Sequence, residues 1–98
     1  MPGILDSDLI DQFNKEGAVL IKGKFDRGWI DKLRKGIKKD IQNPSPRFVR
    51  HTKDDDAPGY FEDFWTWSLY DEFKDFLNNS PAAQIASELL DANQINLV

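Results

Sequence analysis

Few residues of this chain have side chains that could bind a metal or transfer a proton. His51 is its only histidine, and Asp54 stands three positions after it. A metal site made of two histidines and one carboxylate needs a second imidazole, and the spacing to Asp54 is one residue longer than a His-x-Asp pair. A Ser-His-Asp triad would lack the Gly-x-Ser-x-Gly turn that commonly presents the serine. We interpret His51 as a surface-loop histidine, with an acid or base role as the alternative.

Three consecutive aspartates, Asp54, Asp55 and Asp56, raise the question of calcium. An EF-hand loop needs alternating acidic ligands, a central glycine and a terminal glutamate, and that spacing is absent here. Consecutive carboxylates in an extended chain point to alternate sides, so we expect a solvated loop. We predict no catalytic residue and no metal ligand in this chain.

Basic side chains cluster in residues 27–42, where the sequence has helical periodicity. The cations are Lys32, Arg34, Lys35, Lys38 and Lys39. Positive charge near the C-terminal end of a helix complements its dipole. We expect a solvated basic face, with contact to an acidic ligand such as a nucleotide phosphate as the alternative.

Aromatic residues are densest directly after the predicted loop 43–59. They are Tyr60, Phe61, Phe64, Trp65 and Trp67. Such side chains bury large areas, so packing in a core accounts for most of the cluster. Because long loops often border binding sites, Tyr60, Phe61, Trp65 and Trp67 are also candidates for the wall of a substrate pocket.

Four helices and two short strands are expected to position these residues. Helices are predicted from Asp6 to Gly17, over 27–42, over 71–77 and from Ser80 to Leu90, because N-cap residues, Gly17 and the prolines at 44 and 46 mark their ends. One apolar stripe runs along the second helix: Ile30, Leu33, Ile37 and Ile41.

The strands are predicted from the apolar runs at residues 18–21 and 95–98. Two such strands make a marginal sheet on their own. We therefore expect the missing partners to lie after Val98 or on a second chain, with self-association as one form of this. The fold class is α+β, and residues 1–98 form a single partial domain.

Bulk composition excludes several classes of protein. The chain has 98 residues, a net charge of −4 and no cysteine. The negative charge disfavours nucleic-acid partners, no apolar run reaches the roughly 20 residues that cross a bilayer, and the start lacks a signal peptide. The absence of cysteine fits a reducing compartment, so a cytoplasmic protein without a membrane partner is expected.

Three segments resemble the N-terminal third of phytanoyl-CoA dioxygenase-like proteins, which are iron(II)- and 2-oxoglutarate-dependent oxygenases. The first is the helix-to-strand unit at residues 5–23, with its F…G…V-x-I-x-G pattern, continued by Phe25-Asp26. The second covers residues 60–76, with Tyr60-Phe61, Asp63-Phe64 and Trp67. The most specific is Ser80-Pro81-Ala82-Ala83 and the residues that follow, similar to the family's SPAAxIAxxLL helix. The family usually has glycine after this helix, where Asp91 stands here.

The resemblance implies the flank of a double-stranded β-helix, or jelly roll, and a parent hydroxylase that uses Fe(II) and 2-oxoglutarate. The family's iron and co-substrate ligands lie after the strand expected at residues 95–98, so the resemblance assigns none of them to this chain. We expect a non-catalytic N-terminal portion of such an enzyme, inactive alone, whose partner is the remainder of the oxygenase fold. The alternative is a stand-alone binding module that uses the aromatic cluster 60–67 or the basic helix 27–42.

Overall fold

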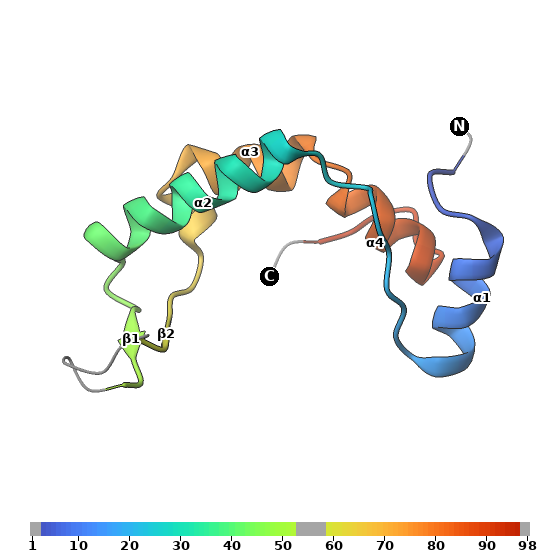
Figure 1. Cartoon of the computed structure of the whole chain (residues 1–98), viewed down its shortest axis with the longest axis horizontal. Coiled ribbons are helices and arrows are strands. Elements are labelled where there is room, and N and C mark those ends of the chain that lie inside the picture. Colours follow the sequence, from blue (N-terminus) through green and yellow to red (C-terminus); the bar gives the residue numbers. More distant parts are fainter. Residues whose placement is uncertain (1–2, 53–58, 97–98) are drawn as a thin grey trace.

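The computed structural model describes residues 3–52 and 59–96 as a helix-rich α+β chain (Figure 1). Its elements in order are α1 (Ser7–Glu16), α2 (Arg27–Gln42), β1 (Val49–Arg50), β2 (Phe61–Glu62), the 3-10 helix η1 (Thr66–Ser68), α3 (Asp71–Asn79) and α4 (Ala82–Leu90). All four predicted helices are confirmed. Within the described residues, no helix combines the length and the apolar character needed to cross a membrane.

The helices begin and end where local sequence signals place them. The carboxylate of Asp26 accepts the Trp29 N–H at 3.1 Å and so caps α2. Gly17 ends α1 in the left-handed conformation, with φ 78°, and its N–H donates to the Phe13 carbonyl. Asp91 ends α4 in the same region of the backbone map, with φ 50°. Aspartate tolerates this conformation better than most residues other than glycine.

The strand predicted at residues 18–21 is wrong, and the described part of the strand predicted at 95–98 is not a strand either. Residues 18–21 connect α1 to α2 without strand structure, and Leu20 is 72% exposed. Ile95 and Asn96 are not in a strand either, and residues 97–98 lie outside the described residues. A strand needs a neighbouring backbone to complete its hydrogen bonds, and in the described chain neither run has one.

The sheet instead forms around the predicted loop. β1 and β2 pair antiparallel, with Val49 opposite Glu62 and Arg50 opposite Phe61. Part of the predicted loop 43–59 is therefore an arm of a hairpin. The three aspartates at 54–56 lie outside the described residues.

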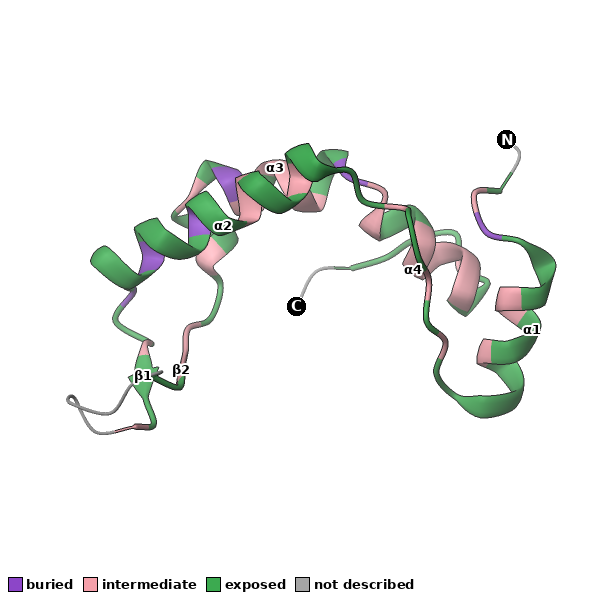
Figure 2. Cartoon of the chain, viewed as in Figure 1, coloured by how far each residue is buried: buried purple, intermediate pink, exposed green. Residues whose placement is uncertain are grey.

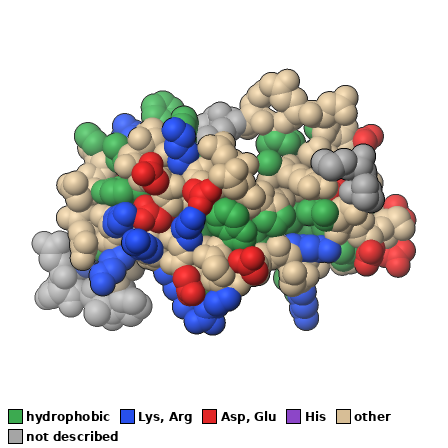
Figure 3. Space-filling model, turned by 90° about the horizontal axis from the view of Figure 1, so that it is seen from above, with side chains coloured by type: hydrophobic (Ala, Val, Ile, Leu, Met, Phe, Trp, Pro, Cys, Tyr) green, Lys and Arg blue, Asp and Glu red, His purple; other side chains and the backbone are tan. Residues whose placement is uncertain are grey.

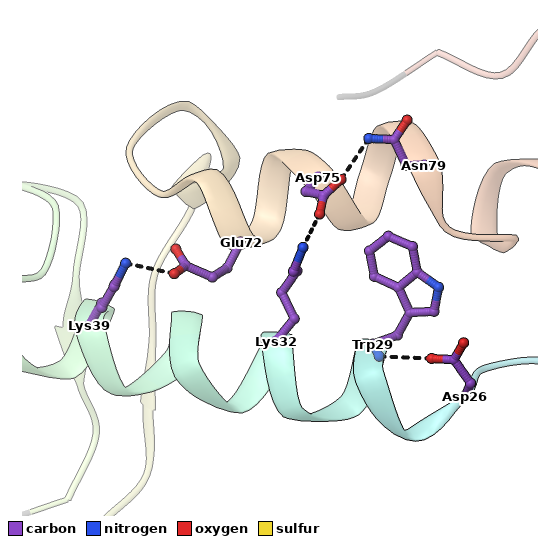
Figure 4. A network of polar contacts seen from close by, with 7 residues as sticks. All are labelled: Asp26, Trp29, Lys32, Lys39, Glu72, Asp75 and Asn79. Carbon is purple, nitrogen blue, oxygen red and sulfur yellow. Dashed lines mark hydrogen bonds and ion pairs between the residues drawn. The ribbon is translucent and has the colours of Figure 1, made fainter.

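Two helix pairs make up the molecule, and they meet where α3 leads into α4 (Figure 1). In the first pair, α2 packs against α3, with Lys39 Nζ 2.6 Å from Glu72 Oε2 and Lys32 bonded to Asp75 (Figure 4). Seen from above, acidic and basic side chains lie next to one another over this helix pair (Figure 3). In the second pair, the Glu88 carboxylate on α4 accepts the N–H groups of Ile4 and Leu5 at 3.0 Å, just before α1.

The apolar stripe of α2 does not face α3. The residues of α2 that are buried are Gly36 and Asp40, whereas Ile30, Ile37 and Ile41 are 39%, 47% and 49% exposed. Since successive helical residues are about 100° apart, the isoleucines lie nearly opposite the two ion-paired lysines. The ion pairs thus hold one side of the helix pair, and the apolar stripe is left uncovered on the other.

Gly36 is the point of closest approach between α2 and α3. A Cβ at this position would lie 3.0 Å from the Phe73 ring and 3.1 Å from the Glu72 Cβ. We expect Gly36→Ala to destabilise the chain by about 1 kcal/mol, because overpacking of about 1–3 kcal/mol outweighs a gain of about 1 kcal/mol in helix propensity. Thermal unfolding followed by circular dichroism measures this. The exposed Arg34→Ala is the control, and an equal or higher Tm for Gly36→Ala would contradict the contact.

The hydrophobic core of residues 3–52 and 59–96 is small. Among the described residues, Leu5 is the one hydrophobic side chain classed as buried, and buried positions are scattered along the ribbon (Figure 2). The radius of gyration is 16.2 Å, against about 13 Å for a compact chain of this length. The accessible surface is 7721 Å², about a third more than the roughly 5,700 Å² of a compact 11.3 kDa monomer. A further protein segment or a second chain can therefore pack against the exposed apolar faces of these helices.

Candidate functional site

The aromatic segment contributes two of its four candidate residues to one cavity. Trp65 and Trp67 line a cavity of ≈ 220 Å³. η1 and α3 supply the rest of the wall through Thr66, Phe73, Phe76 and Leu77. Phe76 is fixed from the other side by a stacked Phe25 ring at 5.5 Å and an edge-on Trp29 ring at 6.0 Å. The structure thus places Trp65 and Trp67 at a built aromatic cavity.

The other two candidates, Tyr60 and Phe61, do not line this cavity. The Tyr60 side chain is 63% exposed, and its ring lies 5.2 Å from that of His51. Phe61 on β2 packs its ring 5.2 Å from Phe48. Both belong to the hairpin, so their predicted place in one wall with Trp65 and Trp67 is not what the structure shows.

Trp65 is held in an unusual backbone conformation. Its φ of 57° and ψ of 31° are left-handed, a region that bulky residues seldom adopt. The Trp65 carbonyl accepts both the N–H and the hydroxyl of Ser68, at 3.1 and 2.7 Å. The Arg47 guanidinium lies 5.2 Å from the centroid of the Trp65 ring, and its Nε donates to the Phe64 carbonyl. These contacts fix an indole that is 59% exposed at the rim of the cavity.

The size of the cavity limits its occupant. Sites that enclose a small-molecule ligand usually measure about 300–1,000 Å³, and this cavity measures ≈ 220 Å³. A space of this size suits one aromatic or branched side chain better than a whole substrate. A second cavity of ≈ 410 Å³ lies where Ile95 and Asn96 pass α4, lined also by Leu77, Asn78, Ala82, Ala83 and Ala86.

A buried polar cluster joins the end of α2 to the hairpin. Asp40 is 6% exposed and Ser45 is 5% exposed. The Asp63 carboxylate accepts the Ser45 N–H at 2.9 Å, the Ser45 hydroxyl and the Phe64 N–H at 2.8 Å. A side-chain hydrogen bond also links Asp63 to Asp40. Asp63 therefore gathers several donors at the start of the aromatic segment.

The two carboxyl groups of this cluster have very different pKa values. Burial, followed by the hydrogen bond and the negative charge of Asp63, raises the pKa of Asp40 to about 6. Burial alone would also raise the pKa of Asp63, but the hydrogen bonds from Ser45, with those from Asp40 and Phe64, lower it to about 2. Between these values the pair carries one proton, and Asp40 holds it.

The charged residues do not form a metal site within the described chain. His51 Nε2 lies 3.2 Å from Glu62 Oε1, an arrangement that provides one imidazole and one carboxylate. In the described ranges, no three histidine or acidic side chains come together as metal ligands. These side chains therefore do not fit an iron ion of the two-histidine, one-carboxylate type.

Two of the five cations on the basic helix are paired with carboxylates of α3. Lys32 and Lys39 make ion pairs with Asp75 and Glu72 across the α2–α3 interface (Figure 4). Both lysine side chains still contact solvent, at 41% and 44% exposed.

The polar cluster has only a weak sequence signal. Asp40 and Asp63 are 23 positions apart and belong to no short motif. One sign was available: Asp40 follows Gly36 by four residues, so the helical period places both on the side of α2 that faces α3. The position of Arg47 over Trp65 has no comparable signal.

Comparisons of this chain with protein-family models, with curated proteins and with solved structures find no match.

Proposed function

We propose that this chain is a non-catalytic packing element, the N-terminal portion of a phytanoyl-CoA dioxygenase-like hydroxylase that depends on Fe(II) and 2-oxoglutarate. The observation that carries the proposal is the uncovered apolar surface. The chain exposes about a third more area than a compact monomer of its mass, and the stripe of α2 is among the exposed parts. In the parent enzyme these helices would buttress the jelly-roll sheet.

Two further features support the resemblance. The Ser80-Pro81-Ala82-Ala83 segment starts α4, with the Ser80 hydroxyl accepting the Ala82 N–H at 3.2 Å. Asp91 takes the left-handed conformation after this helix, where the family usually has glycine. The change of residue type therefore keeps the turn that glycine would make.

The chemistry of the parent reaction would reside outside this chain. Its single histidine cannot supply the two imidazoles of the parent iron site, so we assign it no step of the hydroxylation. The region with Trp65 and Trp67 would border the substrate entrance. The absence of cysteine suits a reducing compartment, and we propose a cytoplasmic location.

Sequencing genomic DNA downstream of the Val98 codon tests the oxygenase part of the proposal. We expect an open reading frame that encodes a His-x-Asp pair and a later histidine, in the same frame or in an adjacent gene. A downstream region with no such sequence would overturn the proposal. Turnover of 2-oxoglutarate by the isolated chain in the presence of Fe(II) would also overturn it.

The packing role has its own test. Replacement of Ile37 and Ile41 by glutamine should reduce binding of a hydrophobic dye and self-association of the isolated chain, with helix content unchanged, because both side chains are exposed. Leu20→Gln with Leu90→Gln removes apolar side chains that are even more exposed, at 72% and 61%, but lie away from α2, so a smaller effect is expected. Equal effects of both pairs would argue against a docking face on α2.

The aromatic cavity favours a second candidate, a stand-alone module that receives one side chain of a partner between Trp65 and Trp67. The two functions differ in the behaviour of the isolated chain. A module should be a monodisperse monomer, whereas a packing element should self-associate through its exposed apolar faces. Sedimentation velocity distinguishes them.

A further inference from the structure

We propose that Asp40 and Asp63 form a proton-dependent latch, in which one shared proton holds the base of the hairpin against the end of α2 and loss of that proton releases it. The hairpin here means β1, β2 and the segments that join them to α2 and η1. The inference concerns the conformation of this chain and does not depend on the proposed oxygenase role.

The geometry identifies the partner that carries the proton. A hydrogen bond between two carboxyl groups requires one of them to be protonated. Asp63 already accepts the Ser45 N–H, the Ser45 hydroxyl and the Phe64 N–H, so it is the ionised member. Asp40 is therefore the donor. Its Oδ1 is buried and has no hydrogen-bond partner among the described residues, so a negative charge on Asp40 would be poorly compensated.

Two cations close to the cluster are engaged with other partners. On α2, Lys39 is paired with Glu72 of α3. From the segment after α2, the Arg47 guanidinium is directed to the Phe64 carbonyl and the Trp65 ring.

Other polar and charged groups around the cluster also have partners other than Asp40. On the hairpin, Glu62 faces His51 and Arg50 lies beside Gly59. From the segment before α3, the Tyr70 hydroxyl donates to the Asn43 carbonyl. The charge that acts on Asp40 is that of Asp63, which is negative. When Asp40 is ionised, separation of the two carboxylates hydrates Asp40 and relieves its electrostatic repulsion with Asp63.

The latch is placed to move the aromatic site. Ser45 lies three residues after α2 ends, and Asp63 lies between β2 and Trp65. The Ser45–Asp63 bonds keep the base of the hairpin closed in either state. Separation from Asp40 therefore shifts the hairpin as a unit, together with the segment that leads to Trp65. The expected result of deprotonation is a change in the distance between α2 and β1, with the helices retained.

The absence of cysteine makes this distance directly measurable. Spin labels on Lys35→Cys of α2 and Val49→Cys of β1 occupy exposed positions, and double electron–electron resonance reports their separation. Because the contact between His51 and Glu62 lies in the same hairpin, His51→Asn is the common background. From pH 4.5 to 8 we expect one narrow distance to give way to a longer, broader distribution, with a midpoint near pH 6.

Two variants decide the outcome. Asp40→Asn supplies an N–H donor to Asp63 that does not titrate, so the narrow distance should persist to pH 8. Asp40→Ala removes the donor and leaves the bonds to Asp63 from Ser45 and Phe64 in place, so the longer, broader distribution should be present already at pH 4.5. Circular dichroism at each pH confirms that the helices are retained. An unchanged distance in the background chain, or the same transition in both variants, would overturn the proposal.

Discussion

Replacement of Phe76 by alanine is expected to lower the free energy of unfolding by about 2 kcal/mol, less than for a fully buried phenylalanine, because Phe76 is half-buried. Phe76 stacks on Phe25, meets the edge of Trp29 and lines the cavity beside Trp67. It therefore links the start of α2, the body of α3 and η1. A chain with so few buried apolar side chains has little else to compensate for this loss.

The measurement is urea unfolding followed by tryptophan fluorescence and by circular dichroism. We expect the midpoint for Phe76→Ala to fall to low denaturant or the transition to disappear. Leu90→Ala is the matched control, because Leu90 is 61% exposed at the end of α4 and should cost less than about 0.5 kcal/mol. Similar effects of the two substitutions would show that the Phe76 cluster does not hold the helix pair together.

The free energy of unfolding is expected to be highest near pH 4 and to fall by about 2 kcal/mol as the pH rises to 6. The folded chain keeps the pKa of Asp40 at about 6, above the ordinary value of 3.8. The folded state therefore binds the proton more tightly than the unfolded state. Its stabilising effect is complete below pH 3.8 and is lost as the pH rises through 6.

Asp63 has the opposite effect at acid pH. Its pKa is lowered from 3.8 to about 2 in the folded chain. Its contribution is present above pH 3.8 and is lost as the pH falls towards 2. The same direction holds for Glu72, Asp75 and Glu88, whose pKa values are lowered by hydrogen bonds from Lys39, from Lys32 and from the backbone of Ile4 and Leu5, respectively.

Urea unfolding at half-unit intervals between pH 3 and 8 measures this profile. The Asp40→Asn variant should lose the decline between pH 4 and 6 and keep the decline at lower pH. Many proteins are most stable between about pH 5 and 8. A stability maximum near pH 4 would therefore indicate the protonated Asp40, and a maximum above pH 5 would indicate that Asp40 is ionised in the folded chain. A stability that rises steadily from pH 4 to 7 in the unmodified chain would contradict a buried protonated Asp40.

The helices could be predicted from the sequence because their signals are local. Asp26 caps the residue three positions on, Gly17 ends α1 by its own backbone freedom, and the prolines at 44 and 46 prevent α2 from continuing. Each of these effects operates within one helical turn. Local signals of the same kind also predicted α3 and α4, such as Ser80 and Pro81 at the start of α4.

The strands and the polar cluster depend on distant partners and could not be predicted in the same way. The apolar run at 18–21 is compatible with a strand, but the sequence does not say whether a second backbone will lie beside it. β1 and β2 pair antiparallel, although β1 lies in the predicted loop and β2 in the aromatic segment. Asp40 and Asp63 meet because α2 and the hairpin bring them together, and no motif joins them.

The aromatic site lies between these cases. The aromatic density of the sequence makes Trp65 and Trp67 candidates for a pocket wall as well as for core packing, and the structure places both beside a cavity. Tyr60 and Phe61 belong to the same run of sequence but sit on the hairpin. The left-handed backbone of Trp65 turns the chain after the hairpin. The sequence has no glycine at this position that would have indicated the turn.

The bonds from Ile4 and Leu5 to Glu88 join residues 84 and 83 positions apart. Contacts of such separation close the longest loop in a chain, so their entropic cost is high and they tend to form late in folding. The contacts between α2 and α3 span shorter loops, at 33 positions for Lys39 and Glu72. We therefore expect α1 to join the folded molecule last, and its amide hydrogens to exchange with solvent sooner than those of α2 and α3.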